Sequence, residues 1–178
     1  MSDKETRKEK VIAVLNKARS MELHAISQYM NQHYSLDDKD YGELAKNMKL
    51  VAIDEMRHAE QFAERIKELG GEPTSEPADV VQKGQDVRAM FPFDTGLEDN
   101  TIENYNAFLS VCRECNDNSS AKLLDTIIDE EQAHLNYFDN VDEHIKTLGD
   151  TYLSKIAGTP ASTGGFSKGF ILSQGAAE

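Results

Sequence analysis

A glutamate stands three residues before a histidine at two places in the sequence. The two pairs are Glu55/His58, within IDEMRHAE, and Glu131/His134. Side chains at this spacing on a helix lie about 60° apart around its axis and about 4.5 Å apart along it, so a carboxylate and an imidazole can reach the same ion. Both groups bind divalent transition metals. Each pair therefore predicts a helix that supplies two metal ligands.

A single glutamate precedes each pair by the same distance. Glu22 lies 33 residues before Glu55, and the same separation joins Glu98 to Glu131. A lone glutamate from each of two helices, with a Glu-x-x-His pair from each of the other two, builds a carboxylate-bridged pair of metal ions inside a four-helix bundle. Four ionised glutamates and two divalent ions are together neutral, which suits a bundle interior of low dielectric constant. The six residues therefore predict a buried site for two metal ions.

Other roles compete for these residues. An isolated Glu-x-x-His pair often occurs by chance on a solvated helix face, so the repeated spacing carries the prediction. Glu98 could have a different role, because Thr95 could open a capping box in which the Glu98 side chain reaches back to the Thr95 amide. Glu103 could also be the metal ligand in place of Glu98. The apolar periodicity extended back from Ile102 and Tyr105 reaches Glu98, whereas Glu103 shares its face with polar residues. Glu98 is therefore the predicted ligand.

Four helices are predicted to carry these residues. Apolar and small side chains recur at alternating steps of four and three residues in four segments, and this period is typical of helices in a bundle. The segments are residues 5–35, 44–69, 98–112 and 124–148. In each segment the same periodicity places a metal-binding residue where a core residue is expected. The six polar residues are therefore predicted to point into the bundle.

The connections between the helices indicate their order. The short linker HYSLDD, residues 33–38, joins the first two, with Asp40 as the predicted cap of the second. Residues 70–94 lack lasting periodicity, and a connection of this length can cross a whole bundle. A short helix is expected over residues 150–158, with Asp150 as its cap. We therefore predict an all-α four-helix bundle of two hairpins with one long crossover and a short fifth helix.

Length and composition exclude several classes of function. The 178 residues suffice for one sizeable core. The formal net charge of −13 disfavours nucleic acid as a partner and attracts cations. The sequence has no run of about 18 apolar residues, and MSDKETRKEK does not resemble a secretory signal, so we expect a cytoplasmic protein that does not enter the membrane.

The chain is predicted to consist of one domain and a tail. Residues 1–158 form the helical domain, and residues 159–178 form a C-terminal segment rich in Gly and Ser. The tail is more apolar than a linker requires, so part of it is expected to pack on a neighbouring surface. Its large apolar residues are Phe166, Phe170, Ile171 and Leu172.

The two cysteines, Cys112 and Cys115, form a CxxC motif inside a predicted helix. No second pair completes a four-thiolate metal site. Cys112 is therefore expected to be a small core residue, with Cys115 at the border of the core.

The stretches MELHAISQYM around Glu22 and IDEMRHAEQFAERI around Glu55 resemble the bacterioferritin family, the haem-containing members of the ferritin-like superfamily. The match covers roughly residues 5–158. It implies a ferritin-like four-helix bundle in which two iron ions are bridged by Glu55 and Glu131. The resemblance also implies a ferroxidase that oxidises Fe(II) with oxygen or peroxide and stores the ferric mineral inside a 24-subunit shell built from two-fold dimers.

The same resemblance implies a haem at Met56. In the family the matching methionine and its symmetry mate bind one haem iron from both sides, and Met56 follows Glu55 by about 100°, so it leaves the bundle when Glu55 enters it. Tyr29 matches a tyrosine near the di-iron centre that assists electron transfer, although its position equally suits core packing. The family's extra iron site on the inner surface uses a histidine and an aspartate. The matching positions here hold Leu50 and Asp54, so the histidine of that site is missing. An electron-donor protein would release the iron.

Two other functions use the same residues. A rubrerythrin-like peroxidase would remove peroxide without storing iron, but it usually brings a four-cysteine iron domain, which two cysteines cannot form. A haem-carrying electron-transfer shell with a merely structural di-iron site is the third reading. Native mass and oxygen consumption with ferrous iron distinguish the three.

Overall fold

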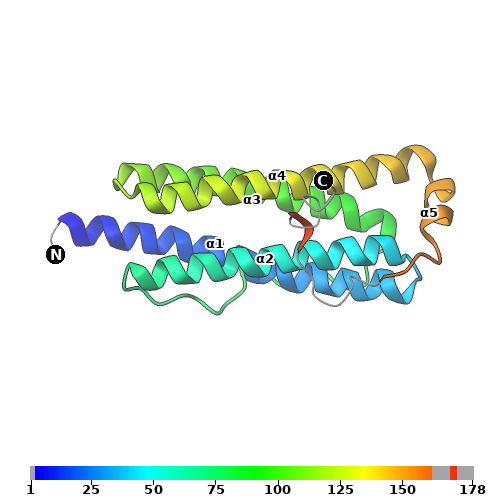
Figure 1. The fold of residues 1–178 in the computed structure, drawn as a ribbon, viewed down its shortest axis with the longest axis horizontal. Helices are drawn as coiled ribbons and strands as arrows, with labels where there is room; N and C mark the ends of the chain where they lie inside the picture. Colours follow the sequence, from blue (N-terminus) through cyan, green and yellow to red (C-terminus); the bar gives the residue numbers. More distant parts are fainter. Residues whose placement is uncertain (1–2, 162–168, 172–178) are drawn as a thin grey trace.

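The computed structural model describes residues 3–161 and 169–171, and its long helices lie side by side in an elongated bundle (Figure 1). The helices are α1 (Asp3–Asp38), α2 (Gly42–Glu68), α3 (Val87–Glu114), α4 (Asn118–Leu148) and α5 (Asp150–Ile156). The predicted all-α bundle with a long crossover and a short fifth helix is confirmed. Within the described ranges, no helix combines the length and the hydrophobicity that a membrane crossing requires.

The bundle consists of two helical hairpins. α1 packs mainly on α2, and α3 packs mainly on α4. The crossover between the hairpins, residues 69–86, runs beside α1 and is hydrogen-bonded to it. The Ala78 N–H donates to the Ser20 carbonyl (2.8 Å), and the Gln82 N–H donates to Oε1 of Gln28 (2.8 Å). The crossover is thus held along the outside of the first hairpin.

The predicted turn of the first hairpin is wrong. Residues 33–38 are the last part of α1 and not a linker, because Leu36 is fully buried and continues the inward-facing row of the helix. α2 begins after Tyr41, which makes no side-chain capping hydrogen bond. Asp40 has a φ of 63° and belongs to the tight turn, so it is not the cap of α2.

The start of α3 also differs from the prediction. α3 begins at Val87, so the crossover ends earlier than the predicted residue 94. Asp86 is its cap, and the Asp86 side chain accepts a hydrogen bond from the Arg88 N–H (3.0 Å). A short acidic side chain in this place satisfies one of the free amides of the first turn.

The early start of α3 decides between the two readings of Glu98. Met90 and Phe91 are fully buried, and their packing keeps this turn helical although Pro92 has no N–H to donate. Thr95 consequently lies inside the helix, where its hydroxyl donates to the Phe91 carbonyl (2.9 Å). The capping-box alternative for Glu98 is therefore wrong.

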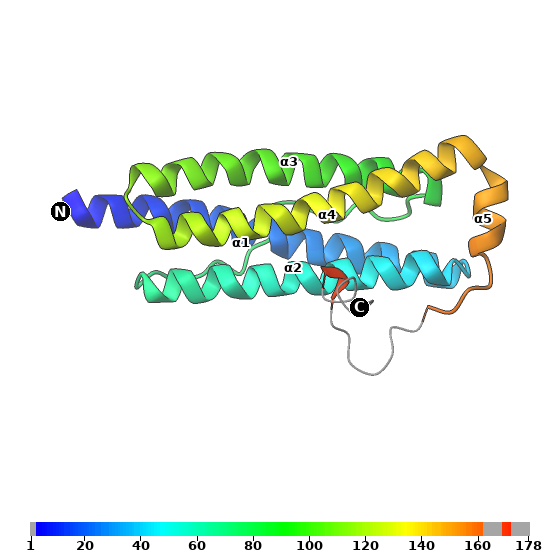
Figure 2. The ribbon, with the colours of Figure 1, turned by 45° about the horizontal axis from the view of Figure 1, so that its top comes forward.

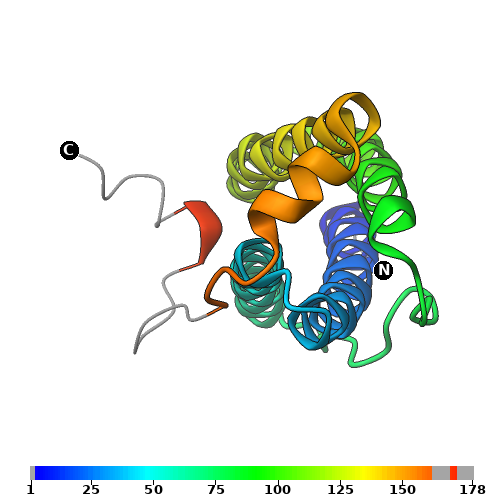
Figure 3. The same cartoon turned by 90° about the vertical axis from the view of Figure 1, so that its right-hand side faces the viewer.

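α5 crosses one end of the bundle (Figure 3) and ends at Ile156, two residues before the predicted end. Gly149, with a φ of 52°, precedes its first turn, so Asp150 is a helical residue and not the cap. After α5 the chain returns to α2, where the Thr159 hydroxyl accepts a hydrogen bond from the Glu43 N–H (2.8 Å).

The hydrophobic core is divided into two clusters by polar residues in the middle of the bundle. One cluster includes Leu15, Phe62, Tyr105 and Leu124. The other includes Leu36, Met48, Phe91 and Phe138. Cys112 is fully buried in the first cluster and Cys115 packs at its edge, as predicted for both. Each long helix thus contributes to both clusters and leaves the space between them to polar side chains.

Two apolar residues of the tail pack on the bundle, which confirms the expectation for them. Phe170 is 7% exposed and belongs to the second cluster, and Ile171 packs against the same cluster. Phe166 and Leu172 lie outside the described residues. The division into a domain over residues 1–158 and a tail over residues 159–178 stays a prediction.

Candidate metal centre

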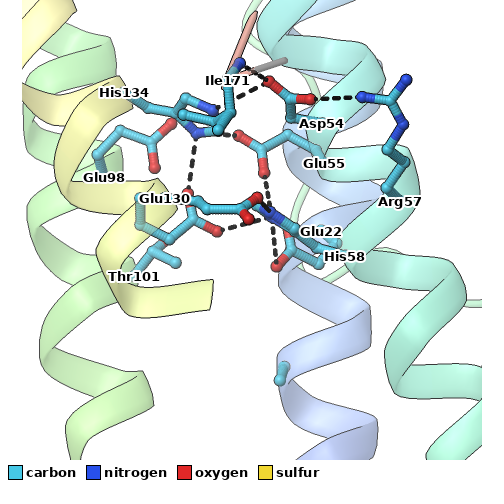
Figure 4. A network of polar contacts seen from close by, with 12 residues as sticks. Glu22, Asp54, Glu55, Arg57, His58, Glu98, Thr101, Glu130, His134 and Ile171 are labelled. Atoms are coloured by element: carbon cyan, nitrogen blue, oxygen red, sulfur yellow. Dashed lines mark hydrogen bonds and ion pairs between the residues drawn. The ribbon is translucent and has the colours of Figure 1, made fainter. Parts of the chain in front are cut away.

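All six residues predicted to bind metal lie together in the middle of the bundle (Figure 4). Each is at most 2% exposed. They come from all four long helices: Glu22 from α1, Glu55 and His58 from α2, Glu98 from α3, and Glu131 and His134 from α4. The centre therefore fills the gap that separates the two hydrophobic clusters, with apolar side chains packed at both of its ends along the bundle.

The six side chains form two overlapping sets of ligand atoms. In each set the atoms lie within 4.8 Å of one another. One set is Glu22, Glu55, His58 and Glu131, and the other is Glu55, Glu98, Glu131 and His134. Only Glu55 and Glu131 belong to both. The geometry is thus that of two neighbouring sites that share two carboxylates, each with one terminal glutamate and one histidine of its own.

Two tyrosines hold the terminal glutamates in place. The Tyr29 hydroxyl of α1 donates a hydrogen bond to Glu98 of α3, and the Tyr105 hydroxyl of α3 donates one to Glu22 of α1. Burial raises the pKa of both phenols well above the usual value, so both stay protonated and able to donate. The sequence reasoning had Tyr29 near the centre and missed Tyr105. A signal existed, because each tyrosine follows a terminal glutamate by seven residues.

Each histidine faces a second carboxylate on its outer side. His58 turns Nδ1 toward Oε2 of Glu55 (3.0 Å), and its Nε2 lies 2.9 Å from Oε2 of Glu130. His134 turns Nδ1 toward Oε2 of Glu131 (3.1 Å) and its Nε2 toward Asp54. An outer carboxylate that accepts the second ring N–H fixes the orientation and the tautomer of a metal-binding histidine, and Glu130 is at hydrogen-bond distance for this. Asp54 is at ion-pair distance from His134, whose Nε2 has no hydrogen-bond partner among the described residues.

Glu130 and Asp54 were not predicted in this role, although the sequence contains a signal for both. Each is the acidic residue directly before a Glu-x-x-His pair. The contacts are crossed: Asp54 of α2 approaches His134 of α4, with 3.6 Å between Oδ2 and Nε2, and Glu130 of α4 approaches His58 of α2. The repeat of the sequence thus includes the outer residues of the centre as well as the ligands.

Burial makes the terminal glutamates easier to protonate when no metal is bound. Burial, and then the negative charges of Glu131 and Glu55, raises the pKa of Glu22 and of Glu98 well above the ordinary value. A carboxyl group among other carboxylates in a dry interior is more stable in its neutral form. Binding of a cation would reverse this preference and release the protons.

The same carboxylates that disfavour the charged form of the glutamates favour the charged form of the histidines. Burial alone would lower the pKa of His58 and His134, but nearby carboxylates, chiefly Glu131 for His58 and Glu55 for His134, raise both pKa values well above normal. Burial by itself would raise the pKa of Glu131. The charges and hydrogen bonds of His58 and His134 outweigh burial and lower this pKa far below the ordinary value. Protons on the imidazoles therefore neutralise the metal-free centre.

Two oxygens show that the donor set fits metal ions. Among the described residues, Oε1 of Glu55 and Oε1 of Glu131 are buried without a hydrogen-bond partner. They lie 3.2 Å from Nδ1 of His134 and 3.1 Å from Nδ1 of His58. Buried carboxylate oxygens without donors are costly unless a cation binds them. A set of four carboxylates and two imidazoles suits divalent iron.

We expect Glu130→Gln to weaken metal binding about 10–100-fold, because an outer residue that orients a ligand typically contributes that much to affinity. The amide keeps the size of the side chain and loses the charge that stabilises His58 in its binding orientation. Titration with Co(II), followed by its visible absorption, measures the affinity.

Asp129→Asn is the matched control for this prediction, since it removes one charge from the neighbouring, exposed position of the same helix. Equal Co(II) affinities of the two variants would contradict the orienting role of Glu130.

The fold and the centre together define a ferritin-like protein, and comparison with known families agrees. The family model of the ferritin-like domain matches residues 12–148. Among characterised relatives, the bacterioferritin of Desulfovibrio desulfuricans is 65% identical over 99% of this chain and 98% of its own. A bacterioferritin of Streptomyces coelicolor is 35% identical over 82% of this chain and 88% of its own. The chain belongs to the bacterioferritin family.

Solved structures give the same assignment. The crystal structure of the D. desulfuricans bacterioferritin, described with a di-iron site in different catalytic states, has a TM-score of 0.92 and 66% identity and covers 96% of this chain and 99% of that one. The bacterioferritin of Mycobacterium tuberculosis has a TM-score of 0.79 and 32% identity and covers 83% and 93%. Bacterioferritins store iron and are ferroxidases, so the predicted class of function is confirmed.

Proposed function

We propose that two ferrous ions bind at the six-residue centre, are oxidised there, and are stored as a ferric mineral by an assembly of many copies of this chain. The convergence of the two ligand sets on Glu55 and Glu131 carries the proposal. One ion is bound by Glu22 and His58, and the other by Glu98 and His134. Both ions share the two bridging carboxylates. The bound iron pair supplies the two electrons that oxygen or peroxide accepts.

The protein side chains prepare the centre for this reaction. Tyr29 and Tyr105 hold the terminal carboxylates at fixed positions before any ion arrives, which reduces the cost of ordering the site. Glu130 orients the His58 imidazole through a hydrogen bond, and the Asp54 carboxylate lies 3.6 Å from Nε2 of His134, so that Nδ1 of each ring faces the centre. His58 gives up its proton when a cation replaces it, and the carboxylates compensate the charge of the ions.

Iron loading of the native protein tests this proposal. Purified protein receives Fe(II) in air in large excess, and native mass and iron content are measured on the same sample. A large assembly that retains many more than about two ions per chain supports storage, since the centre itself holds one pair. A dimer that retains only about two ions per chain would contradict storage and favour the peroxidase.

The outer face of α2 supports a haem site at Met56. Met56 is 54% exposed on a groove of ≈ 420 Å³ between α1 and α2, which Leu23, Ile26 and Ala63 also line. An exposed thioether beside apolar side chains fits the edge of a porphyrin and an axial ligand to its iron. Haem binding by Met56 and its counterpart across a two-fold axis is our proposal for this groove, and bound haem supplies an electron-transfer group.

We expect Met56→Leu to remove most of the haem from the purified protein, because leucine fills the same space and has no sulfur to bind iron. The ratio of Soret absorbance to protein measures the haem content of each preparation. Met21→Leu, on the other side of α1, is the matched control. Wild-type haem content in Met56→Leu would exclude Met56 as the ligand.

The assembly that we propose is a 24-subunit shell built from two-fold dimers, located in the cytoplasm. The charge of −13 per chain favours the attraction of ferrous ions to such a shell. Both cysteines are free, in keeping with a reducing compartment. Release of stored iron requires a reductant, and an electron-donor protein that docks on the haem-bearing face would supply it.

A further inference from the structure

A short piece of the tail lies directly beside the metal centre. Residues 169–171, which we name the C-terminal cap, lie beside α2 (Figure 2), and Figure 4 shows Ile171 next to His134 of α4 and Asp54 of α2. The Phe170 ring meets the His134 ring edge-on with 6.1 Å between centroids, and it lies 5.1 Å from the Tyr137 ring. The cap thus packs on side chains of both α2 and α4 beside the centre.

The cap also fixes the outer carboxylate of His134. The Ile171 N–H donates a hydrogen bond to Oδ2 of Asp54 (2.9 Å), while Arg57 pairs with Oδ1 (2.9 Å). The Asp54 side chain is only 3% exposed. Both oxygens of Asp54 are therefore engaged, one of them by the cap.

The backbone of the cap fits this place only with glycine at its first position. Gly169 has a φ of +81°, a conformation that side chains disfavour. A Cβ atom there would overlap the Asp54 carboxylate and the Arg57 guanidinium. The sequence of the cap is thus matched to the surface next to the centre.

The two halves of the centre, otherwise repeated, differ at this point. Glu130 is the outer carboxylate beside His58, and Asp54 is the outer carboxylate beside His134. The Glu130 side chain, however, is 32% exposed. Asp54 is covered by the cap, and no described segment covers Glu130 in the same way. One side of the centre is therefore open to solvent through an acidic residue, and the other side is closed.

We propose that the C-terminal cap closes the Asp54 and His134 side of the metal centre, so that ions enter and leave on the Glu130 and His58 side. The inference rests on the proposed function only in that the centre binds metal. Phe170 supplies the apolar seal, and the Ile171 amide anchors the cap to Asp54. Removal of the seal gives ions and chelators a second route to the centre.

Removal of bound Co(II) by EDTA tests the cap in the full-length protein. We expect Phe170→Ala and Gly169→Ala to lose Co(II) at least about tenfold faster than wild type, because a displaced cap replaces a locally closed state with an open one. Gly84→Ala is the control. Gly84 has a similar φ of +76°, and a Cβ there meets nothing within 4 Å. Rates for both cap variants within about twofold of the control would overturn the proposal.

Hydrogen exchange of the Ile171 amide provides a second readout that does not depend on metal. The amide is expected to exchange slowly in wild type and at least about tenfold faster in Gly169→Ala. Fast exchange in the wild-type protein would overturn the cap. Absence of Co(II) binding in the wild-type protein would overturn both the proposed metal centre and the proposed role of the cap. Co(II) binding with unchanged rates of loss to EDTA in the cap variants would overturn the role of the cap alone.

Discussion

A chain in which Glu55 and Glu131 are both replaced by alanine is expected to oxidise ferrous iron no faster than buffer without protein. Both candidate ligand sets contain these two residues, so the change removes two carboxylates from each set. Loss of an orienting residue alone costs about 10–100-fold in affinity, and loss of two direct ligands costs more than that. The initial rate of ferric product formation in air measures the effect.

A matched double variant distinguishes the ligands from the general charge of the protein. Glu64→Ala with Glu103→Ala removes the same two charges from exposed positions of α2 and α3. It also tests Glu103, the rival of Glu98. We expect wild-type oxidation from this control, and circular dichroism shows whether both variants keep their helices. A wild-type rate in the Glu55 and Glu131 variant would contradict the proposed centre.

The sequence was sufficient to predict that these six side chains meet inside the bundle, because their chemistry conflicts with their position. A glutamate or a histidine in an inward-facing row is costly without a compensating charge, so six such residues at repeated spacings leave few explanations. Tyr105 and Glu130 could have been found with the same repeat, since each has a counterpart at the equivalent position of the other half.

Helix ends were less predictable because tertiary packing decided them. Residues 33–38 contain polar residues that are typical of a linker, but burial of Leu36 keeps them helical. Pro92 is the sixth residue of α3, and burial of Met90 and Phe91 in the core keeps this part of the chain helical. The cap was out of reach for a different reason, because Ile171 meets Asp54 across 117 residues of sequence. No local pattern encodes such a contact.

Metal binding is expected to raise the melting temperature by an amount that grows with pH. With free Co(II) at 100 times the dissociation constant, each site adds about 2.7 kcal/mol to the free energy of unfolding. For a chain of this size, two sites correspond to a rise of about 10–20 °C near neutral pH. Melting curves with and without Co(II), at one protein concentration and at several pH values, measure it.

The sign of the pH effect follows from the protons that the metal-free centre holds. The folded pKa values of His58 and His134 are raised, so their stabilising contribution is complete below the unfolded pKa of about 6.5 and is lost as pH rises through the folded values. Glu22 and Glu98 also hold protons in the folded state that the unfolded chain releases. All four groups therefore make the metal-free protein less stable as pH rises.

The metal-loaded protein escapes this loss, because the ions replace the protons and bind more tightly as fewer protons compete. Glu131 has a lowered pKa in the folded state, so its stabilising contribution is present above the unfolded value of about 4.3 and is lost only as pH falls through the folded pKa. The contribution of Glu131 is therefore constant over the pH range tested. The rest of the surface is the same in both states, so the difference between the two melting temperatures isolates the centre. A difference that stays constant or shrinks from about pH 5.5 to about pH 7.5 would show that protons and metal do not compete for these six residues.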